Sequence, residues 1–219
     1  MLEEQYLKEV RCGLQTLDKV FNNRQVNYRV LGSVLVAAIN GKPHRTLGDI
    51  DILLDQSNLH RVVGELQKEG YKVINMKKLC FSWLEAHKEN CIGFTFLLVG
   101  KFCEDYFSYK YGWVELRISG SYLTPTKYSL LGYSFVGIPL CSVYEGLKIS
   151  DLNPKRTLDN EVVKRVLGNK ISGGNTLEQS FQVYLLGVAI PHLYPLFSRL
   201  YNIYGGLRVK FGKRYEIWD

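Results

Sequence analysis

The chain has 219 residues, a formal net charge of +7, and 46% hydrophobic against 22% charged residues. This balance is typical of a folded protein with one good-sized core and a smaller appendage, and it argues against wholesale disorder and a coiled coil. No apolar run reaches the roughly 20 residues of a membrane-spanning helix, and the polar start MLEEQYLKEVR lacks a signal-peptide core. We therefore expect a cytoplasmic protein with no membrane partner.

Helical and strand-like patterns alternate through the first part of the chain. Helices are expected at residues 7–21, 34–39 and 59–66, the last with Ser57 as its N-cap, and strands at residues 27–31, 49–54 and 71–74. The run from Asn40 to Pro43 must end the second helix, and Gly70 ends the third. An alternation of helix and strand predicts a mixed α/β lobe.

The rest of the chain changes from strand patterns to helical ones. Strands are expected at residues 91–99, 113–118 and 128–136, the last around the turn-prone Gly132. An aromatic segment near the end, residues 177–200, is interrupted by prolines and either packs on the first lobe or docks a partner. We predict an α/β (α+β) fold, with a mixed β-sheet lobe flanked by helices over residues 1–140 and a mainly helical C-terminal region over residues 141–219.

Neither the cysteines nor the histidines form a metal-binding pattern. The cysteines are Cys12, Cys80, Cys91, Cys103 and Cys141, and the histidines are His44, His60, His87 and His192. The odd number and wide spacing of the cysteines predict reduced thiols that serve in packing. The dispersed histidines are expected at the surface or in packing, with His44 alone near the site described next.

Asp49 and Asp51 stand two residues apart in the strand-like run DIDILLD. Residues i and i+2 of a strand point to the same face, with α-carbons roughly 6.6 Å apart. Two carboxylates this close repel one another unless a cation compensates them, and Mg²⁺ is a hard cation that prefers oxygen ligands. The alternative is a pair of ordinary acids on a solvated strand face.

A glycine–serine turn precedes this strand in the run YRVLGSVLVAAINGKPHRTLGDIDILLD. Gly32 would let the backbone approach a ligand closely, and the following helix would offer the N–H groups of its first turn to a triphosphate. Ser33 adds a hydroxyl, and Arg45 could steady Asp49 or a phosphate by charge-assisted hydrogen bonds. The combination predicts a phosphate site beside a metal site, whereas Gly32 and Ser33 alone could form a simple turn.

This arrangement resembles the nucleotidyltransferase superfamily typified by DNA polymerase beta, and within it the branch of AbiEii-type toxins and antibiotic nucleotidyltransferases. The resemblance covers roughly residues 28–73. It implies a Mg²⁺- or Mn²⁺-dependent enzyme that transfers a nucleoside monophosphate from an NTP, such as ATP, to an acceptor and releases pyrophosphate. Asp49 and Asp51 would be catalytic metal ligands, and Gly32 and Ser33 would bind the nucleotide.

Two cations in a later segment extend the resemblance. Lys148 and Arg156 lie in YEGLKISDLNPKRTLDNEVV, which is similar to a helical segment that follows the catalytic lobe in such proteins. The resemblance implies that one of these cations reaches the nucleotide's phosphates. The alternative is a solvated helix face, or an ion pair with Asp159.

The third carboxylate of such enzymes, which helps to activate the acceptor hydroxyl, has no obvious counterpart. The buried strand at residues 91–99 has Thr95 where the acid is expected, and a threonine cannot act as a base near neutral pH. Glu115 is the candidate third catalytic acid, provided that its strand lies beside the aspartate pair. Otherwise Glu115 is a strand acid that pairs with Arg117 or Lys110.

Positive charge is concentrated in the C-terminal third, where six Lys or Arg stand against three acids between residues 148 and 170. A basic acceptor region suits RNA, particularly tRNA, better than a cationic aminoglycoside. We therefore expect toxin-like modification of RNA, which would make a cognate antitoxin protein a partner. The alternatives are an antibiotic nucleotidyltransferase and a catalytically impaired nucleotide-binding module of the same fold.

Overall fold

The computed structural model describes residues 2–22, 26–78, 81–102, 106–111, 113–148, 154–168 and 181–190. The chain divides into two compact units, one formed by Met1–Phe102 with Pro125–Ile138, and the other by Cys103–Thr124 with Pro139–Asp219. The first unit thus ends close to the predicted boundary at residue 140, but the second unit also takes in an earlier segment. Two lobes that divide at residue 140 stay a prediction.

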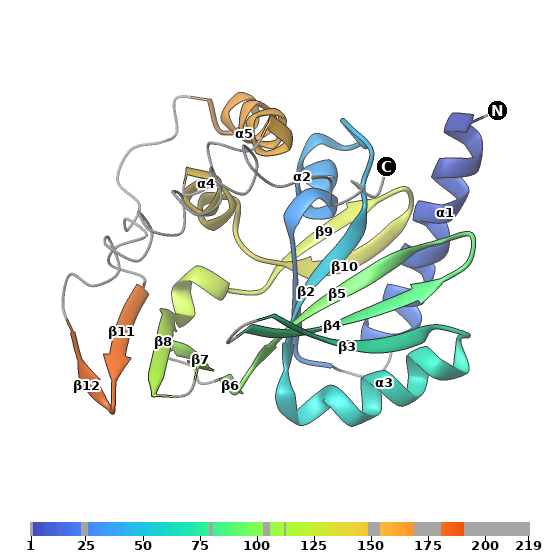
Figure 1. Cartoon of the computed structure of the whole chain (residues 1–219). Helices are drawn as coiled ribbons and strands as arrows, with labels where there is room; N and C mark the ends of the chain where they lie inside the picture. Colours follow the sequence, from blue (N-terminus) through green and yellow to red (C-terminus); the bar gives the residue numbers. More distant parts are fainter. Residues whose placement is uncertain are drawn as a thin grey trace. The chain divides into compact units, whose positions relative to one another are not determined.

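A seven-stranded mixed sheet forms the first unit, in the order β3-β4-β5-β2-β1-β10-β9 (Figure 1). Strand β2 lies at its centre, parallel to β5 and antiparallel to β1. The strands are β1 Tyr28–Leu31, β2 Asp49–Asp55, β3 Lys72–Lys78, β4 Phe81–Lys88, β5 Cys91–Val99, β9 Thr126–Leu130 and β10 Tyr133–Gly137. Together with the helices described next, this sheet confirms the predicted mixed α/β fold class.

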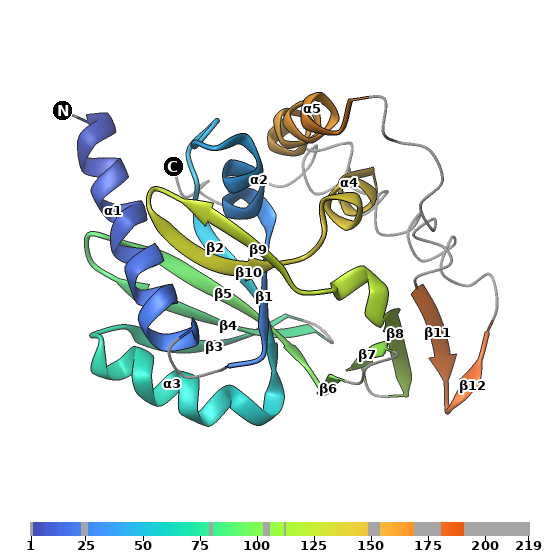
Figure 2. The same ribbon diagram turned by 180° about the vertical axis from the view of Figure 1, so that it is seen from behind.

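Helices cover both faces of this sheet, with α1 in front of it and α2 behind it in Figure 2. The helical elements are α1 Leu2–Leu17, the π-helix Asp18–Asn22, α2 Gly32–Asn40 and α3 Leu59–Lys68, which follows a 3₁₀ turn at Gln56–Asn58. Helix α1 packs so closely on β5 that a Cβ at Gly13 would overlap the side chain of Ile92.

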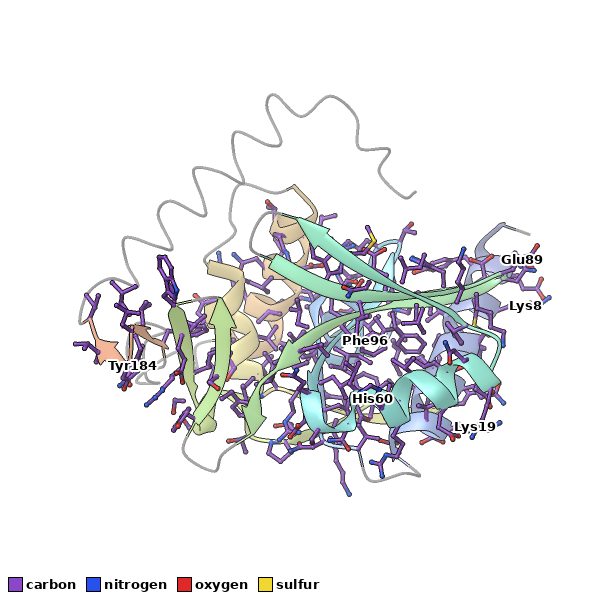
Figure 3. The ribbon with its side chains drawn as sticks, turned by 60° about the horizontal axis from the view of Figure 1, so that its bottom comes forward. Lys8, Lys19, His60, Glu89, Phe96 and Tyr184 are labelled. Atoms are coloured by element: carbon purple, nitrogen blue, oxygen red, sulfur yellow. A yellow bond between two sulfur atoms is a disulfide. The ribbon has the colours of Figure 1, made fainter. Side chains whose placement is uncertain are left out.

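Alternation along β2 and β5 separates a core face from a second face that carries the polar residues. Ile50 and Ile52 of β2, and Phe94 and Phe96 of β5, are all 2% exposed or less. Phe21 stacks on Phe96 beneath helix α1, and Figure 3 shows Phe96 within the layer of side chains between the strands and the helices. Because successive side chains of a strand point to opposite faces, the intervening residues of β2 and β5 line the other face.

Tyr28 fixes the strand that leads into the glycine–serine turn. Its buried hydroxyl donates a hydrogen bond to Asn22 Oδ1 at 2.6 Å and accepts one from the backbone N–H of Val136 at 3.1 Å. Burial raises the pKa of Tyr28 to about 12. The phenol therefore stays protonated and keeps donating, which holds β1 against the π-helix and β10.

Most elements expected in the first unit are confirmed, with three corrections. The N-cap of α3 is Asn58, which makes no side-chain capping bond, so Ser57 is not the N-cap. Asp55 caps the 3₁₀ turn before α3, and its Oδ1 accepts from the backbone N–H of Ser57 at 2.8 Å. Strand β4 was not expected at all. The strand expected at residues 128–136 is the hairpin of β9 and β10, which turns at Leu131 and Gly132, both with positive φ.

The second unit contains four described strands in the order β12-β11-β8-β7, and two described α-helices. Its elements are β7 Tyr106–Tyr111, β8 Val114–Ser119, the 3₁₀ turn Gly120–Leu123, α4 Leu140–Lys148, α5 Pro154–Leu167, β11 Phe181–Leu185 and β12 Val188–Ala189. Strand β6, Lys101–Phe102, pairs in the same sheet as these strands but belongs to the first unit. Most of the aromatic segment at residues 177–200 lies outside the described residues. No described helix is long and apolar enough to cross a membrane.

A disulfide joins Cys12 of α1 to Cys91 at the start of β5, so the expectation of reduced thiols was wrong for these two residues. Their α-carbons are 5.3 Å apart, and the hydroxyl of Tyr71 lies 2.9 Å from the sulfur of Cys91. Cys141 is free and exposed, and the remaining two cysteines fall outside the described residues. The bridge pins the N-terminal helix to the strand beside β2.

Reduction of this bridge is expected to destabilise the fold. It spans 79 residues of sequence, and in the chain-entropy account closing a loop of that size raises the free energy of the unfolded chain by about 4.5 kcal/mol. Urea unfolding should therefore shift to lower urea concentration when dithiothreitol is added, or when Cys12 and Cys91 are both changed to serine. The Cys141→Ser variant should respond to dithiothreitol as the wild type does. Equal unfolding midpoints with and without reductant would show that no bridge forms.

Candidate active site

Asp49 and Asp51 lie half-buried on the face of β2 opposite the core. Asp51 is the register partner of Leu31, the last residue of β1, so the aspartate pair lies next to the point where β1 turns into α2. A Cβ added at Gly32 would overlap Asp51 Oδ2 and lie 3.0 Å from Asp51 Cγ. The structure thus brings the second aspartate directly against the glycine–serine turn.

The turn at Gly32 needs glycine for two reasons. Its φ is +66°, in the left-handed region that residues with a Cβ rarely adopt, and its missing side chain makes room for the Asp51 carboxylate. Helix α2 begins at this residue, and Leu31 at its N-cap makes no side-chain capping bond. Ser33 follows, 7% exposed, so the backbone N–H groups and the hydroxyl of the first helical turn lie beside a carboxylate.

Thr95 lies beside the aspartate pair in the position where the third acid was expected. Strand β5 is parallel to β2, with Asp51 paired to Thr95 and Asp49 paired to Gly93. The Thr95 hydroxyl donates a hydrogen bond to Asp49 Oδ2. This bond orients the Asp49 carboxylate, but the threonine supplies no proton acceptor for an incoming hydroxyl.

Arg45 lies in the loop that precedes β2, and Tyr6 of α1 holds this loop. The Tyr6 hydroxyl accepts from the backbone N–H of Leu47 at 2.7 Å and donates to the carbonyl of Arg45 at 3.4 Å. Burial raises the pKa of Tyr6, against the opposing effect of the hydrogen bond from Leu47, so the phenol remains a donor. The Arg45 guanidinium donates to the carbonyl of Thr46 at 3.0 Å.

Glu115 lies on β8, in the sheet of the second unit. Its neighbours there are β7 and β11, whereas the neighbours of β2 are β1 and β5. Arg117 donates from Nε to Glu115 Oε1 at 2.7 Å, and its guanidinium lies over the ring of Tyr184, 3.9 Å from the ring centre. The Glu115 strand is thus not a hydrogen-bonded neighbour of the aspartate strand, and a role for Glu115 in catalysis stays a prediction.

Lys148 and Arg156 also belong to the second unit, at the end of α4 and in the first turns of α5. Arg156 is half-buried, and Asp159, one turn further along α5, is fully buried. Phosphate binding by either cation stays a prediction.

The strand that was not expected, β4, adds Glu85 and His87 to the face that carries the aspartates. Glu85 is the register partner of Thr95, so its side chain projects from the same face of the sheet. His87 follows two residues later. The signal in the sequence was the alternation of polar and apolar residues in SWLEAH just before the turn at Glu89 and Asn90. A histidine outside any metal pattern had suggested only a surface or packing position.

The donor set at the turn fits a hard divalent cation. Asp49 and Asp51 offer carboxylate oxygens on one face, and the missing side chain at Gly32 lets the Asp51 carboxylate lie against the start of α2. Mg²⁺ is commonly held by one or two carboxylates, with water and substrate phosphates as its other ligands. Among the described residues, no group of three or more His, Cys, Asp or Glu side chains is arranged to hold a metal ion.

No protein-family model matches the sequence, and no curated protein matches it either. Solved structures do match the fold. The lincomycin-bound structure of the lincosamide antibiotic adenylyltransferase LnuA aligns with a TM-score of 0.59 at 19% identity, over 70% of this chain and 96% of LnuA. The chain has the nucleotidyltransferase fold.

A second adenylyltransferase supports the same fold. The structure of ANT(2″)-Ia in complex with adenylyl-2″-tobramycin aligns with a TM-score of 0.54 at 11% identity, over 72% of this chain and 88% of the other. A solution structure of the same resistance factor gives a TM-score of 0.55 at 12% identity. These structural alignments establish a common nucleotidyltransferase fold, which confirms at the level of fold the resemblance inferred from the aspartate and glycine–serine motifs.

Proposed function

We propose that the chain is an NTP-dependent nucleotidyltransferase that transfers a nucleoside monophosphate to a hydroxyl acceptor and releases pyrophosphate. The observation that carries the proposal is the contact between the Asp51 carboxylate and Gly32 at the start of α2. In this proposal the two acids bind the metal beside the N–H groups of a helix N-terminus, which is what transfer from a triphosphate requires.

The residues of the site are proposed to bind the phosphates, to bind the metal ion and to orient its ligands. The N–H groups of the first turn of α2, with the Ser33 hydroxyl, would bind phosphate oxygens. Asp49 and Asp51 would hold Mg²⁺ or Mn²⁺, and Thr95 orients Asp49 through its hydrogen bond. When bound, the metal ion would neutralise the charge that develops on the phosphates. Arg45 in the loop before β2, and Lys148 and Arg156 in the second unit, are the proposed cations for the outer phosphates.

For the acceptor we propose RNA, with tRNA as the first candidate. The net charge of +7 favours a polyanionic acceptor over a cationic drug. Toxin-like activity, and control by an antitoxin protein, would follow from this acceptor. The second candidate is an antibiotic, favoured by the fold that the chain shares with enzymes bound to lincomycin and to an adenylylated tobramycin. A nucleotide-binding module without turnover is the third, favoured by Thr95 in the place of an acid.

Label transfer decides among these functions. Purified protein is incubated with each α-labelled NTP, Mg²⁺ and either total RNA, lincomycin or tobramycin, and the products are separated by size. We expect label on RNA and none on the drugs. Label on a drug would make the chain an antibiotic-modifying enzyme. If no acceptor is labelled but calorimetry shows Mg²⁺-dependent NTP binding, the chain is a binding module, and the proposal of transferase activity is wrong.

A further inference from the structure

Six residues on the site face of the sheet form two rows that run across three neighbouring strands. One row is Asp51 on β2, Thr95 on β5 and Glu85 on β4, as given by the strand registers. The other begins at Asp49 on β2, passes Gly93 on β5 and reaches His87 on β4. The rows place Glu85 and His87 on the same face as the aspartates, with only Thr95 and Gly93 between them.

Gly93 lets β4 lie close to β5, with the His87 imidazole beside it. A Cβ built at Gly93 would lie 3.4 Å from His87 Nδ1 and 2.9 Å from the carbonyl oxygen of Ala86, so a side chain there would collide with β4. The pairing of β4 with β5 is irregular between Ala86 and Lys88, around His87. Irregularities of this kind redirect a side chain, and they occur often next to active sites. The imidazole therefore faces the position above Gly93.

Glu85 holds the imidazole in one orientation. Its Oε2 lies 3.1 Å from His87 Nε2, and its Oε1 accepts from Trp83 Nε1 at 2.7 Å. A carboxylate only accepts hydrogen bonds, so Nε2 carries the proton and Nδ1, on the side of Gly93, carries the lone pair in the neutral ring. The side chains of His87 and Glu85 are 46% and 26% exposed, so an acceptor molecule can reach them.

The charged groups around His87 come from three strands. Lys72 on β3 is the register partner of His87, Glu85 lies on β4 itself, and Asp49 lies on β2 beyond Gly93. The surroundings of His87 thus carry both signs of charge.

We propose that the Glu85–His87 pair replaces the third carboxylate that Thr95 cannot provide, with His87 as the proton acceptor for the acceptor hydroxyl and Glu85 as its positioning residue. In the reaction, His87 Nδ1 takes the hydroxyl proton while the oxygen bonds to the α-phosphorus. The bond from that phosphorus to the bridging oxygen breaks, its electron pair leaves with pyrophosphate, and the imidazolium returns its proton to water. This inference rests on the proposed nucleotidyl transfer.

Single-turnover and steady-state kinetics of His87→Ala and Glu85→Gln in the full chain test the pair. We expect His87→Ala to lower kcat by about 10²- to 10⁴-fold, the range typical of a lost general base, with the KM for NTP within about twofold of wild type. Added imidazole should raise the kcat of His87→Ala by at least about tenfold, because it can occupy the vacated position and accept the proton. Glu85→Gln should lower kcat less than His87→Ala.

His60→Ala is the matched control, since His60 is also exposed but lies on α3, against the other face of the sheet (Figure 3). It should leave kcat unchanged. If His87→Ala does not fold, as judged by urea unfolding, His87→Gln takes its place in the comparison of kcat. The inference is wrong if either His87 variant transfers at the wild-type rate. It is also wrong if kcat falls in Glu115→Gln but not in the His87 variants. Either result would leave the proposed function standing. No transfer by the wild type would overturn both.

Discussion

Changing both Asp49 and Asp51 to asparagine should reduce nucleotidyl transfer by about 10³-fold or more, because the site loses the charge that compensates a bound cation. The same double change should leave the free energy of unfolding equal to or above that of the wild type. Two carboxylates on one strand face repel each other when no cation lies between them, so replacing them with neutral side chains removes a repulsion that lowers the stability of the fold. Opposite effects on rate and stability are characteristic of residues held for function.

Asp55→Asn is the control for this pair. Asp55 lies on the same strand and the same face, four residues beyond Asp51, and its Oδ1 accepts from the N–H of Ser57. Asparagine retains a carbonyl oxygen for that bond, so both activity and stability should stay close to wild type. Transfer by the double variant within about threefold of wild type would show that the aspartates are ordinary surface acids.

The substitution Gly32→Ala should strongly reduce transfer through geometry alone, without a change of charge. The added Cβ would overlap Asp51 Oδ2, and the residue would have to keep a φ of +66°. The strained backbone costs roughly 1 kcal/mol of stability, and the displaced carboxylate should lower kcat/KM by about 10²-fold or more, since a misplacement of 1 Å in such sites costs about that much. Kinetics and urea unfolding of the same preparation measure the two effects.

Gly41→Ala separates the effect of the strained backbone from the effect of the displaced Asp51 carboxylate. Gly41 lies at the other end of the same helix with a φ of +79°, and a Cβ there would meet nothing within 4 Å. It should therefore show the stability loss of the strained backbone while its kcat/KM stays close to wild type. Equal kinetic effects at Gly32 and Gly41 would mean that the contact between Gly32 and Asp51 has no part in catalysis.

Local patterns were sufficient to predict the centre of the site. The alternation in DIDILLD placed Asp49 and Asp51 on one face of a strand, and the glycine–serine turn marked the start of a helix just after another strand. Both features depend on residues within a few positions of one another, and the structure brings them into contact through the pairing of β1 with β2. The expected place of Thr95 beside the aspartates is likewise confirmed by the pairing of β2 with β5.

Features that depend on distant residues could not be predicted in this way. Glu85 joins the site face only because β4 pairs with β5 in one register, and a shift of one residue would turn it into the core. The disulfide joins residues that are 79 positions apart, and spacing alone cannot reveal such a contact. Glu115 had a suitable strand pattern, but the pattern carries no information on which sheet the strand joins.

A crystal structure of the full chain with Mg²⁺ and a non-hydrolysable NTP tests the central claim most directly. The account predicts a metal ion coordinated by Asp49 and Asp51 at about 2.0 to 2.1 Å, with the triphosphate against the backbone of Gly32 and Ser33 at the start of α2. A nucleotide bound away from that turn, or a metal ion held by other residues, would contradict it.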